Sequence, residues 1–116
     1  MARYFVDDEF RCSCCGALPD GGMDGLLVSI LDVLRHKLNT PLLITSGYRC
    51  SQCNANCGGV ENSQHRFGSA ADVLVPDGVN LDYMADVARS LGADGIGRYY
   101  DGGFVHIDTR GYIADW

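Results

Sequence analysis

The chain has 116 residues, of which 47% are hydrophobic, so its length and composition suit one folded domain with a single core. Its formal net charge is -6, which argues against nucleic acid as a partner, because neutralising phosphates requires clustered Lys and Arg. The longest apolar stretch, GLLVSILDVL, contains Ser29 and Asp32 and is too short to span a bilayer, so we expect no membrane insertion.

The first half of the chain predicts one helix and one strand after an irregular, Cys-rich segment, residues 1–21. From Asp24, apolar residues recur every three or four positions, which predicts an amphipathic helix with Asp24 as its N-cap and with Asn39 and Pro41 ending it. PLLITS, residues 41–46, then predicts a short strand, and GYRCSQCNANCGG a loop. The expected apolar face of the helix comprises Leu26, Leu27, Ile30, Leu31, Leu34 and Leu38.

The second half predicts a strand, a helix and a hairpin. AADVLV, residues 70–75, is the strand, and NLDYMADVARSLG predicts a helix with Asn80 as its N-cap and Gly92 just beyond its end. GIGRYY (95–100) and FVHIDT (104–109) flank DGG, which indicates a hairpin. This order of elements is typical of an α+β fold with an antiparallel sheet.

Two histidines and one aspartate from separate segments are candidate metal ligands. His65, Asp72 and His106 together offer two nitrogens and one oxygen, and a catalytic zinc site typically takes three protein ligands and leaves one position open. His106 and Asp108 would share one face of the last strand, because side chains alternate along a strand. Taken alone, that pair is more typical of a polar sheet face than of a metal site. His36 lies near the charged end of the first helix, where we expect it to be solvated.

The residues around these candidates resemble a known family. SQHRFGSAAD, residues 63–72, resembles the S-x-H-x-x-G-x-A-x-D motif of the zinc D-alanyl-D-alanine carboxypeptidase family, which includes L-alanyl-D-glutamate endopeptidases of phage lysins. SGYRC upstream and GFVHIDTR downstream resemble further elements of that family in the same order, and FRCSCCG is similar to the opening of its smaller members. The resemblance implies a small antiparallel sheet with helices packed on one side, in a single zinc peptidase-like domain over residues 1–116.

The resemblance also implies a function: a zinc metallopeptidase that hydrolyses a peptide bond at a D-amino acid in peptidoglycan stem peptides, as a carboxypeptidase or an endopeptidase. His65, Asp72 and His106 would bind one catalytic Zn²⁺. Arg49 would stabilise the reacting carbonyl or bind a substrate carboxylate, or else form a surface ion pair. Ser63 would bind substrate or cap a turn. We expect a monomer whose partner is a peptidoglycan peptide.

One position departs from the family pattern. Many members carry Glu or Asp three residues before the second histidine, as a general base, and this chain has Gly103 there. Asp108 is the first candidate for the base and Asp101 the second, provided that the carboxylate reaches the attacking water. Asp108 would alternatively orient His106. Without a base, the chain would be a non-catalytic, zinc-containing cell-wall binding module of the same fold.

The six cysteines permit either disulfides or a second metal site. They form two groups, Cys12, Cys14 and Cys15, then Cys50, Cys53 and Cys57. Each group contains a C-x-x-C pair, and two such pairs can build a closed structural zinc site, here on Cys12, Cys15, Cys50 and Cys53. We favour disulfides, because Cys14 and Cys57 would otherwise lack partners. Both arrangements tie the N-terminal segment to the loop that carries Arg49.

Two further questions stay open. A cysteine nucleophile, Cys50 or Cys57 paired with His106, is a rival chemistry, but it leaves His65 and Asp72 unexplained. The opening MARYFVDDEF has no apolar segment typical of a signal peptide, which is compatible with a cytoplasmic protein, a trimmed secreted domain or a phage lysis product. Five aromatic residues would line a cleft or pack on the sheet: Tyr48, Tyr99, Tyr100, Tyr112 and Trp116.

Overall fold

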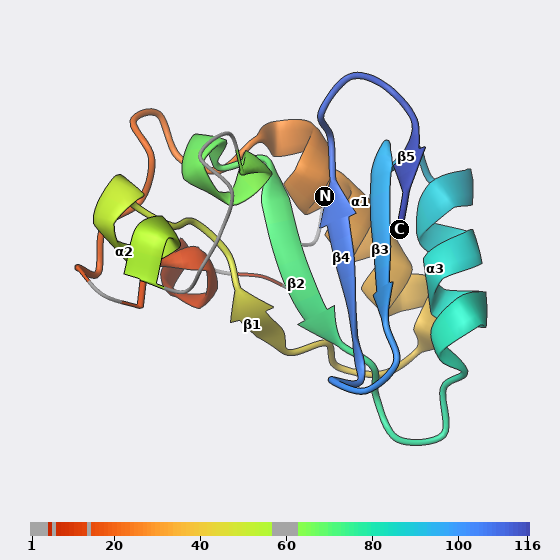
Figure 1. Cartoon of the computed structure of the whole chain (residues 1–116). Helices are drawn as coiled ribbons and strands as arrows, with labels where there is room; N and C mark the ends of the chain where they lie inside the picture. The colour runs from red at the N-terminus through yellow and green to blue at the C-terminus, as the bar shows by residue number, and fades with distance from the viewer. Residues whose placement is uncertain (1–4, 6, 14, 57–62) are drawn as a thin grey trace.

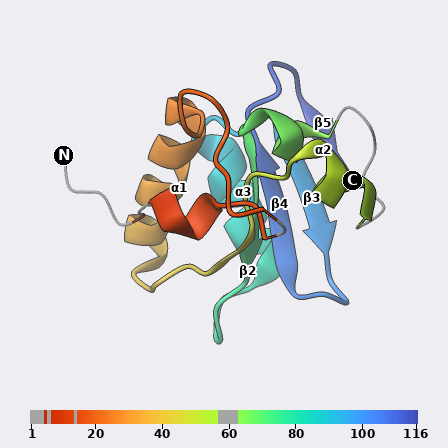
Figure 2. The same cartoon turned by 90° about the vertical axis from the view of Figure 1, so that its left-hand side faces the viewer.

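The structure, a computed structural model, describes residues 5, 7–13, 15–56 and 63–116. In these residues a five-stranded sheet carries the helices α1 (Gly25–Leu38) and α3 (Leu81–Ser90) on one face (Figures 1 and 2). The short helix α2 (Ser51–Asn56) lies towards the other face (Figure 2). The α+β class and the packing of the two long helices on one side are therefore confirmed. Within the described residues, no helix has the length and apolar character needed to cross a membrane.

The sheet is mixed, although its four main strands are antiparallel as expected. The strand order is β1-β2-β4-β3-β5, and β5 pairs in parallel with β3. The expected antiparallel pairing is confirmed for β1 to β4, and the short strand β5 adds a parallel pairing at one edge that the sequence did not predict. The strands are β1 (Ile44–Ser46), β2 (Ala70–Leu74), β3 (Gly95–Tyr99), β4 (Phe104–Asp108) and β5 (Ala114–Asp115).

Both long helices begin at the predicted caps. The Asp24 carboxylate accepts a hydrogen bond from the backbone N–H of Leu27 at 3.1 Å, and the Asn80 side chain accepts one from Tyr83 at 3.0 Å, so each satisfies a free donor of the first turn. The predicted apolar face of α1 is right except for Leu26, which is 55% exposed, while Val28 is buried.

Three short helical segments were not predicted. They are α2 and the 3₁₀-helices η1 (Asp7–Phe10) and η2 (Gln64–Phe67). Each is too short to show a full amphipathic period, and their surroundings are rich in Gly, Asn and Ser, which favour a loop interpretation. The site depends on two of them, because η2 carries His65 and α2 follows directly after Arg49 and Cys50.

The two faces of the sheet have different chemistry. Val105 and Ile107 of β4 are fully buried in the core with α1 and α3. His106 and Asp108 alternate with them and therefore lie on the opposite face. The predicted alternation is confirmed by the 2.6 Å contact between His106 Nε2 and Asp108 Oδ2. The two long helices thus pack on the apolar face of the sheet, and the opposite, polar face carries the candidate metal ligands.

Candidate metal centre and active site

Strand pairing brings two of the three predicted ligands together. Asp72 of β2 is the direct cross-strand partner of His106 of β4, and Asp72 Oδ1 lies 3.1 Å from His106 Nδ1. His65 comes from η2, just before β2, and its Nε2 lies 3.3 Å from the same carboxylate oxygen. One ligand atom from each side chain lies within 4.8 Å of the other two. The structure therefore assembles the predicted set.

The orientation of His65 fits a metal ion. Its Nδ1 lies 2.8 Å from the backbone carbonyl oxygen of Gly47, and a carbonyl can only accept, so Nδ1 carries the proton. Neutral His65 then turns the lone pair of Nε2 towards a carboxylate oxygen. This nitrogen is buried and makes no hydrogen bond in the described part of the structure. A cation between Nε2 and Asp72 would satisfy both acceptors, and a metal-binding histidine usually donates its other N–H in this way.

His106 is held in the same manner by a carboxylate. Its Nε2 lies 2.6 Å from Asp108 Oδ2, while its Nδ1 faces Asp72. Asp108 is 0% exposed. Arg110 donates from Nε and Nη2 to the Asp108 carboxylate and from its backbone N–H to Oδ1. Asp108 is thus fully engaged on the side of the imidazole that faces away from Asp72.

The pKa shifts follow from these contacts. Burial would raise the pKa of the Asp72 carboxyl, but the adjacent His106 and His65 rings hold it well below its usual range. Burial acts likewise on Asp108, and His106 and Arg110 lower its pKa. Burial would lower the pKa of His106, whereas hydrogen bonds to Asp108 and Asp72 raise it. Both aspartates are therefore ionised at neutral pH, as metal ligation or histidine orientation requires.

Two glycines of β3 make room for this arrangement. A Cβ atom at Gly95 would collide with the Asp108 carboxylate, and one at Gly97 would come within 2.7 Å of the Trp116 indole nitrogen. Gly97 and His106 are cross-strand partners, and the rings of Trp116 and His106 have their centroids 4.9 Å apart. The missing side chains thus leave space for the carboxylate and for an aromatic wall beside His106.

Arg49 reaches the site from the loop after β1. Its backbone N–H donates to the His65 carbonyl at 3.0 Å. Its Nη2 lies 3.9 Å from Asp72 Oδ2, and its Nη1 donates to Asn54 Oδ1 at 3.4 Å. The guanidinium is mostly buried, so it is placed beside the ligand cluster and not in the surface ion pair that the sequence left open.

Ser63 and Gly103 have clear local roles. The Ser63 hydroxyl accepts a hydrogen bond from the His65 backbone N–H at 3.3 Å and caps η2, which matches the capping alternative. Gly103 has φ +68 in the β3–β4 turn, a left-handed conformation that favours glycine over residues with a side chain. An acidic residue at position 103 is thus disfavoured by the backbone of the turn itself.

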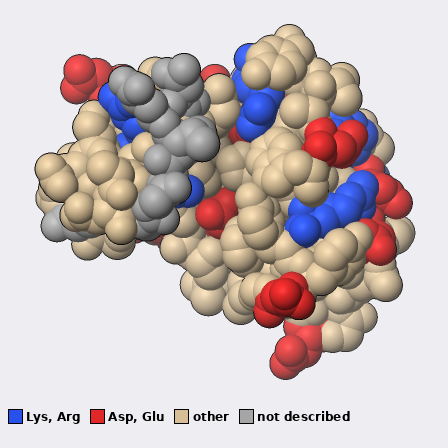
Figure 3. Space-filling view, viewed as in Figure 1, with Lys and Arg blue, Asp and Glu red and all other residues tan. Residues whose placement is uncertain are grey.

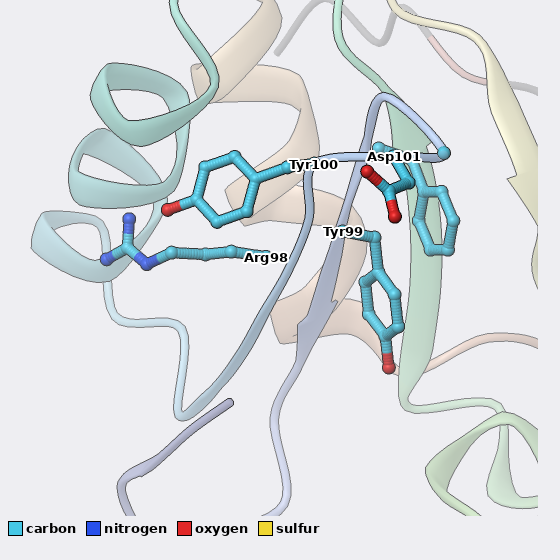
Figure 4. A pocket seen from close by; sticks show the side chains of 6 residues that line it. Arg98, Tyr99, Tyr100 and Asp101 are labelled. Atoms are coloured by element: carbon cyan, nitrogen blue, oxygen red, sulfur yellow. The ribbon is translucent and has the colours of Figure 1, made fainter.

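Asp101, the second candidate for a general base, lies in the same turn. It lines an open pocket of about 350 Å³ with Arg98, Tyr99 and Tyr100 (Figure 4). Arg98 and Tyr100 point from this pocket towards α3 (Figure 4), where both contact Asp82. Asp101 therefore lies at the hairpin end of the sheet, between β3 and β4.

Several residues of the site were missed by the sequence analysis. The Gly47 carbonyl and Asn54 position His65 and Arg49. Arg110 fixes Asp108, and its guanidinium lies over the Trp116 ring, with its carbon 4.8 Å from the ring centroid. Arg110 has a sequence signal, since it lies two residues from Asp108 on the same extended segment. Trp116 was considered only as a general cleft or packing residue.

Among the described cysteines, the favoured disulfide bonding is confirmed for Cys53. This bond removes its sulfur from the four-cysteine zinc site that the sequence allowed. Cys12, Cys15 and Cys50 are not disulfide-bonded, and their sulfurs lie within 4.8 Å of one another. Cys14 and Cys57, which the sequence left in need of partners, and the use of Cys57 as a nucleophile lie outside the described residues.

Charge on this side of the molecule is mixed. In Figure 3, which has the view of Figure 1, blue and red side chains alternate over the strands and α3. Arg98 accounts for part of this pattern, because it forms ion pairs with Asp82 and Asp86 at 3.1 Å.

The chain is similar to known proteins. A family model described as Peptidase M15 matches residues 3–108. The chain is 34% identical over 83 residues to the zinc D-Ala-D-Ala carboxypeptidase of Streptomyces albus G. The matched region covers 70% of this chain and 32% of that protein. The chain is 38% identical over 74 residues to the peptidoglycan L,D-endopeptidase MepK of Escherichia coli K12, covering 60% and 40% of the two chains. The chain thus spans well under half the length of these curated relatives.

Proposed function

The chain belongs to the peptidase M15 family, and on that premise we propose that it is a zinc-dependent peptidase acting on peptidoglycan stem peptides. The bond it cleaves would involve a D-amino acid. The names of the matched relatives support this substrate class, since one is a D-Ala-D-Ala carboxypeptidase and the other a peptidoglycan endopeptidase. A zinc ion bound by this chain would supply Lewis-acid activation of the peptide carbonyl and of water.

One observation carries the proposal. His65 Nε2 and His106 Nδ1 both face Asp72 Oδ1, while the other nitrogen of each ring is held by an oxygen acceptor, the Gly47 carbonyl or the Asp108 carboxylate. Two imidazole nitrogens that converge on one carboxylate oxygen form a set of ligand atoms that a divalent cation can bridge. We therefore assign His65, Asp72 and His106 as the zinc ligands.

The surrounding residues would act on the ligands and on the substrate. Asp108 would hold the His106 ring so that Nδ1 faces the ion, and Arg110 would keep Asp108 ionised and in place. We propose this positioning role for Asp108 in preference to the general base, because its carboxylate is buried against His106 Nε2 and Arg110. Arg49 would bind the reacting carbonyl oxygen or a substrate carboxylate, as its mostly buried guanidinium beside Asp72 allows.

The test is peptide-bond hydrolysis in purified peptidoglycan, measured as free amino groups released. We expect release by the zinc-loaded protein, and loss of release with a chelator and in His65→Ala, because each removes the ion. The matched control is His36→Ala, which changes an exposed histidine on α1 and should leave activity unchanged. Full activity of His65→Ala would contradict the proposal.

The same experiment decides between the peptidase and a non-catalytic binding module, which the glycine at position 103 kept open. Zinc-loaded protein that sediments with peptidoglycan but releases no amino groups would be the binding module. Analysis of the products separates the two peptidase types. Free D-alanine would indicate a carboxypeptidase, and new amino termini on longer fragments an endopeptidase.

A further inference from the structure

Three cysteine sulfurs lie together at a second place in the molecule. Cys12 and Cys15 follow η1, and Cys50 precedes α2. Their sulfurs are within 4.8 Å of one another, and the Sγ atoms of Cys12 and Cys50 are 3.7 Å apart. Tetrahedral zinc with thiolate bonds of about 2.3 Å places two sulfurs about 3.8 Å apart, so the observed separation matches two ligands of one ion.

The backbone around the thiols is arranged to receive negative charge. The N–H of Cys50 points to the sulfur of Cys12, and the N–H of Cys53 points to the sulfur of Cys50, both at 3.5 Å. An N–H that donates to sulfur stabilises a thiolate more than a neutral thiol. Thiolates are the form in which cysteine binds metals.

Two backbone hydrogen bonds hold Cys12 close to the residues that follow Cys15. Gly16 N–H donates to the Cys12 carbonyl at 2.8 Å, and Cys12 N–H donates to the Ala17 carbonyl at 2.9 Å. The sulfurs of Cys12 and Cys15 both lie within 4.8 Å of the Cys50 sulfur. A C-x-x-C pair followed by glycine in a left-handed conformation, here Gly16 with φ +71, lets two thiolates converge without backbone strain.

We infer that Cys12, Cys15 and Cys50 bind a second divalent zinc ion, separate from the ion of the His65 cluster. Three thiolates fill three positions of a tetrahedral site. Cys15 is exposed, so water occupies the fourth position on that side. The inference does not depend on the proposed peptidase activity, because it uses none of the residues of that site.

This ion would join two segments that are distant in sequence. The N-terminal segment already contacts the loop after β1, since Tyr48 N–H donates to the Phe10 carbonyl at 2.8 Å. A Cβ atom at Gly47 would come within 2.7 Å of the Phe10 backbone, so these two segments of the chain pass in close contact. The second ion would fasten this crossing next to Arg49 and to the carbonyl that orients His65.

The test is zinc content of the full chain, purified with reductant and excess zinc and then separated from unbound metal. We expect about two ions per chain for the natural sequence, and about one each for Cys15→Ser and His65→Ala. Ser13→Ala, which changes an exposed residue of the same loop, should keep both ions. Cys15→Ser with the same zinc content as the natural chain would overturn the inference.

A second measurement decides the matter if Cys15→Ser does not fold. Cobalt replaces zinc in tetrahedral sites, and only thiolate ligation gives sulfur-to-cobalt charge-transfer absorption. We expect this absorption in the natural chain and in His65→Ala, because the His65 cluster contains no sulfur. Its absence from both, or peptide mapping that finds a disulfide between Cys12 and Cys50 under these conditions, would refute the second site.

Discussion

The two clusters of metal-binding side chains are built on different supports. His106 and Asp72 stand opposite each other on adjacent strands of a sheet that two helices cover from behind. Cys12 and Cys50 approach each other from a turn and a loop, joined by a few backbone hydrogen bonds. The first cluster takes its geometry from the core of the protein, and the second from the contact between two surface segments.

The difference indicates what an ion contributes in each place. Strand pairing holds Asp72 and His106 opposite each other, so an ion there would add chemistry to a geometry that the sheet already supports. At the cysteines the ion would supply most of the cross-link, as in small domains whose folding depends on metal. Arg49 lies at the junction of the two regions, because it precedes Cys50 in sequence and contacts Asp72 in space.

Arg49→Lys should have the largest effect among substitutions that leave both ligand sets intact. Lysine keeps the charge but loses the planar pair of donors that can hold a carbonyl oxygen or carboxylate. We expect kcat to fall about 10²- to 10³-fold, the range for loss of a transition-state donor, with zinc content unchanged. Arg66→Lys, an arginine of η2 that contacts Ser51, is the matched control. A loss confined to zinc content would instead assign Arg49 to structure.

Asp108→Asn should have an intermediate effect, and it distinguishes positioning from base catalysis. If Asp108 orients His106, the substitution weakens zinc affinity about 10- to 100-fold, as measured by competition with a chromogenic chelator. Activity at saturating zinc should then largely return. Asp115→Asn, an exposed aspartate paired with Arg89, should leave both quantities unchanged. Normal zinc affinity with lost activity would restore Asp108 as the general base.

Trp116→Ala should have the smallest effect of the three. The indole is 47% exposed, stacks near His106 and donates to the Tyr99 hydroxyl at 2.7 Å. As a substrate wall it would contribute about 0.5–1.5 kcal/mol, so KM should rise about 2- to 12-fold with little change in kcat. Tyr112→Ala, which removes another exposed aromatic ring, serves as the comparison. Equal effects of the two substitutions would remove Trp116 from the site.

The sequence predicted those features that depend on local periodicity. The alternation in FVHIDT correctly placed His106 and Asp108 on one face, and the caps Asp24 and Asn80 correctly began the two long helices. The motif resemblance also selected the three side chains that the fold brings together. These successes rest on patterns that operate within one element.

What the sequence did not predict depends on how elements meet. Periodicity says that Asp108 shares a face with His106, but not which ring nitrogen it contacts, and that choice decides between a base and a positioning residue. The contact of Trp116 with His106 depends on the parallel pairing of β5 with β3. A strand of two residues is too short to be recognised from its sequence pattern. The thiol cluster likewise depends on a crossing between segments separated by 38 positions.

The direct pairing of Asp72 with His106 also bears on how the chain reaches its native state. A slip of β2 by one residue against β4 would set Ala71 or Val73 opposite His106 and turn Asp72 towards the helices. Since an ion that needs all three ligands recognises just one alignment, it would lower the free energy of that alignment alone. Zinc binding would then favour the native strand alignment while the chain folds, before any substrate is bound.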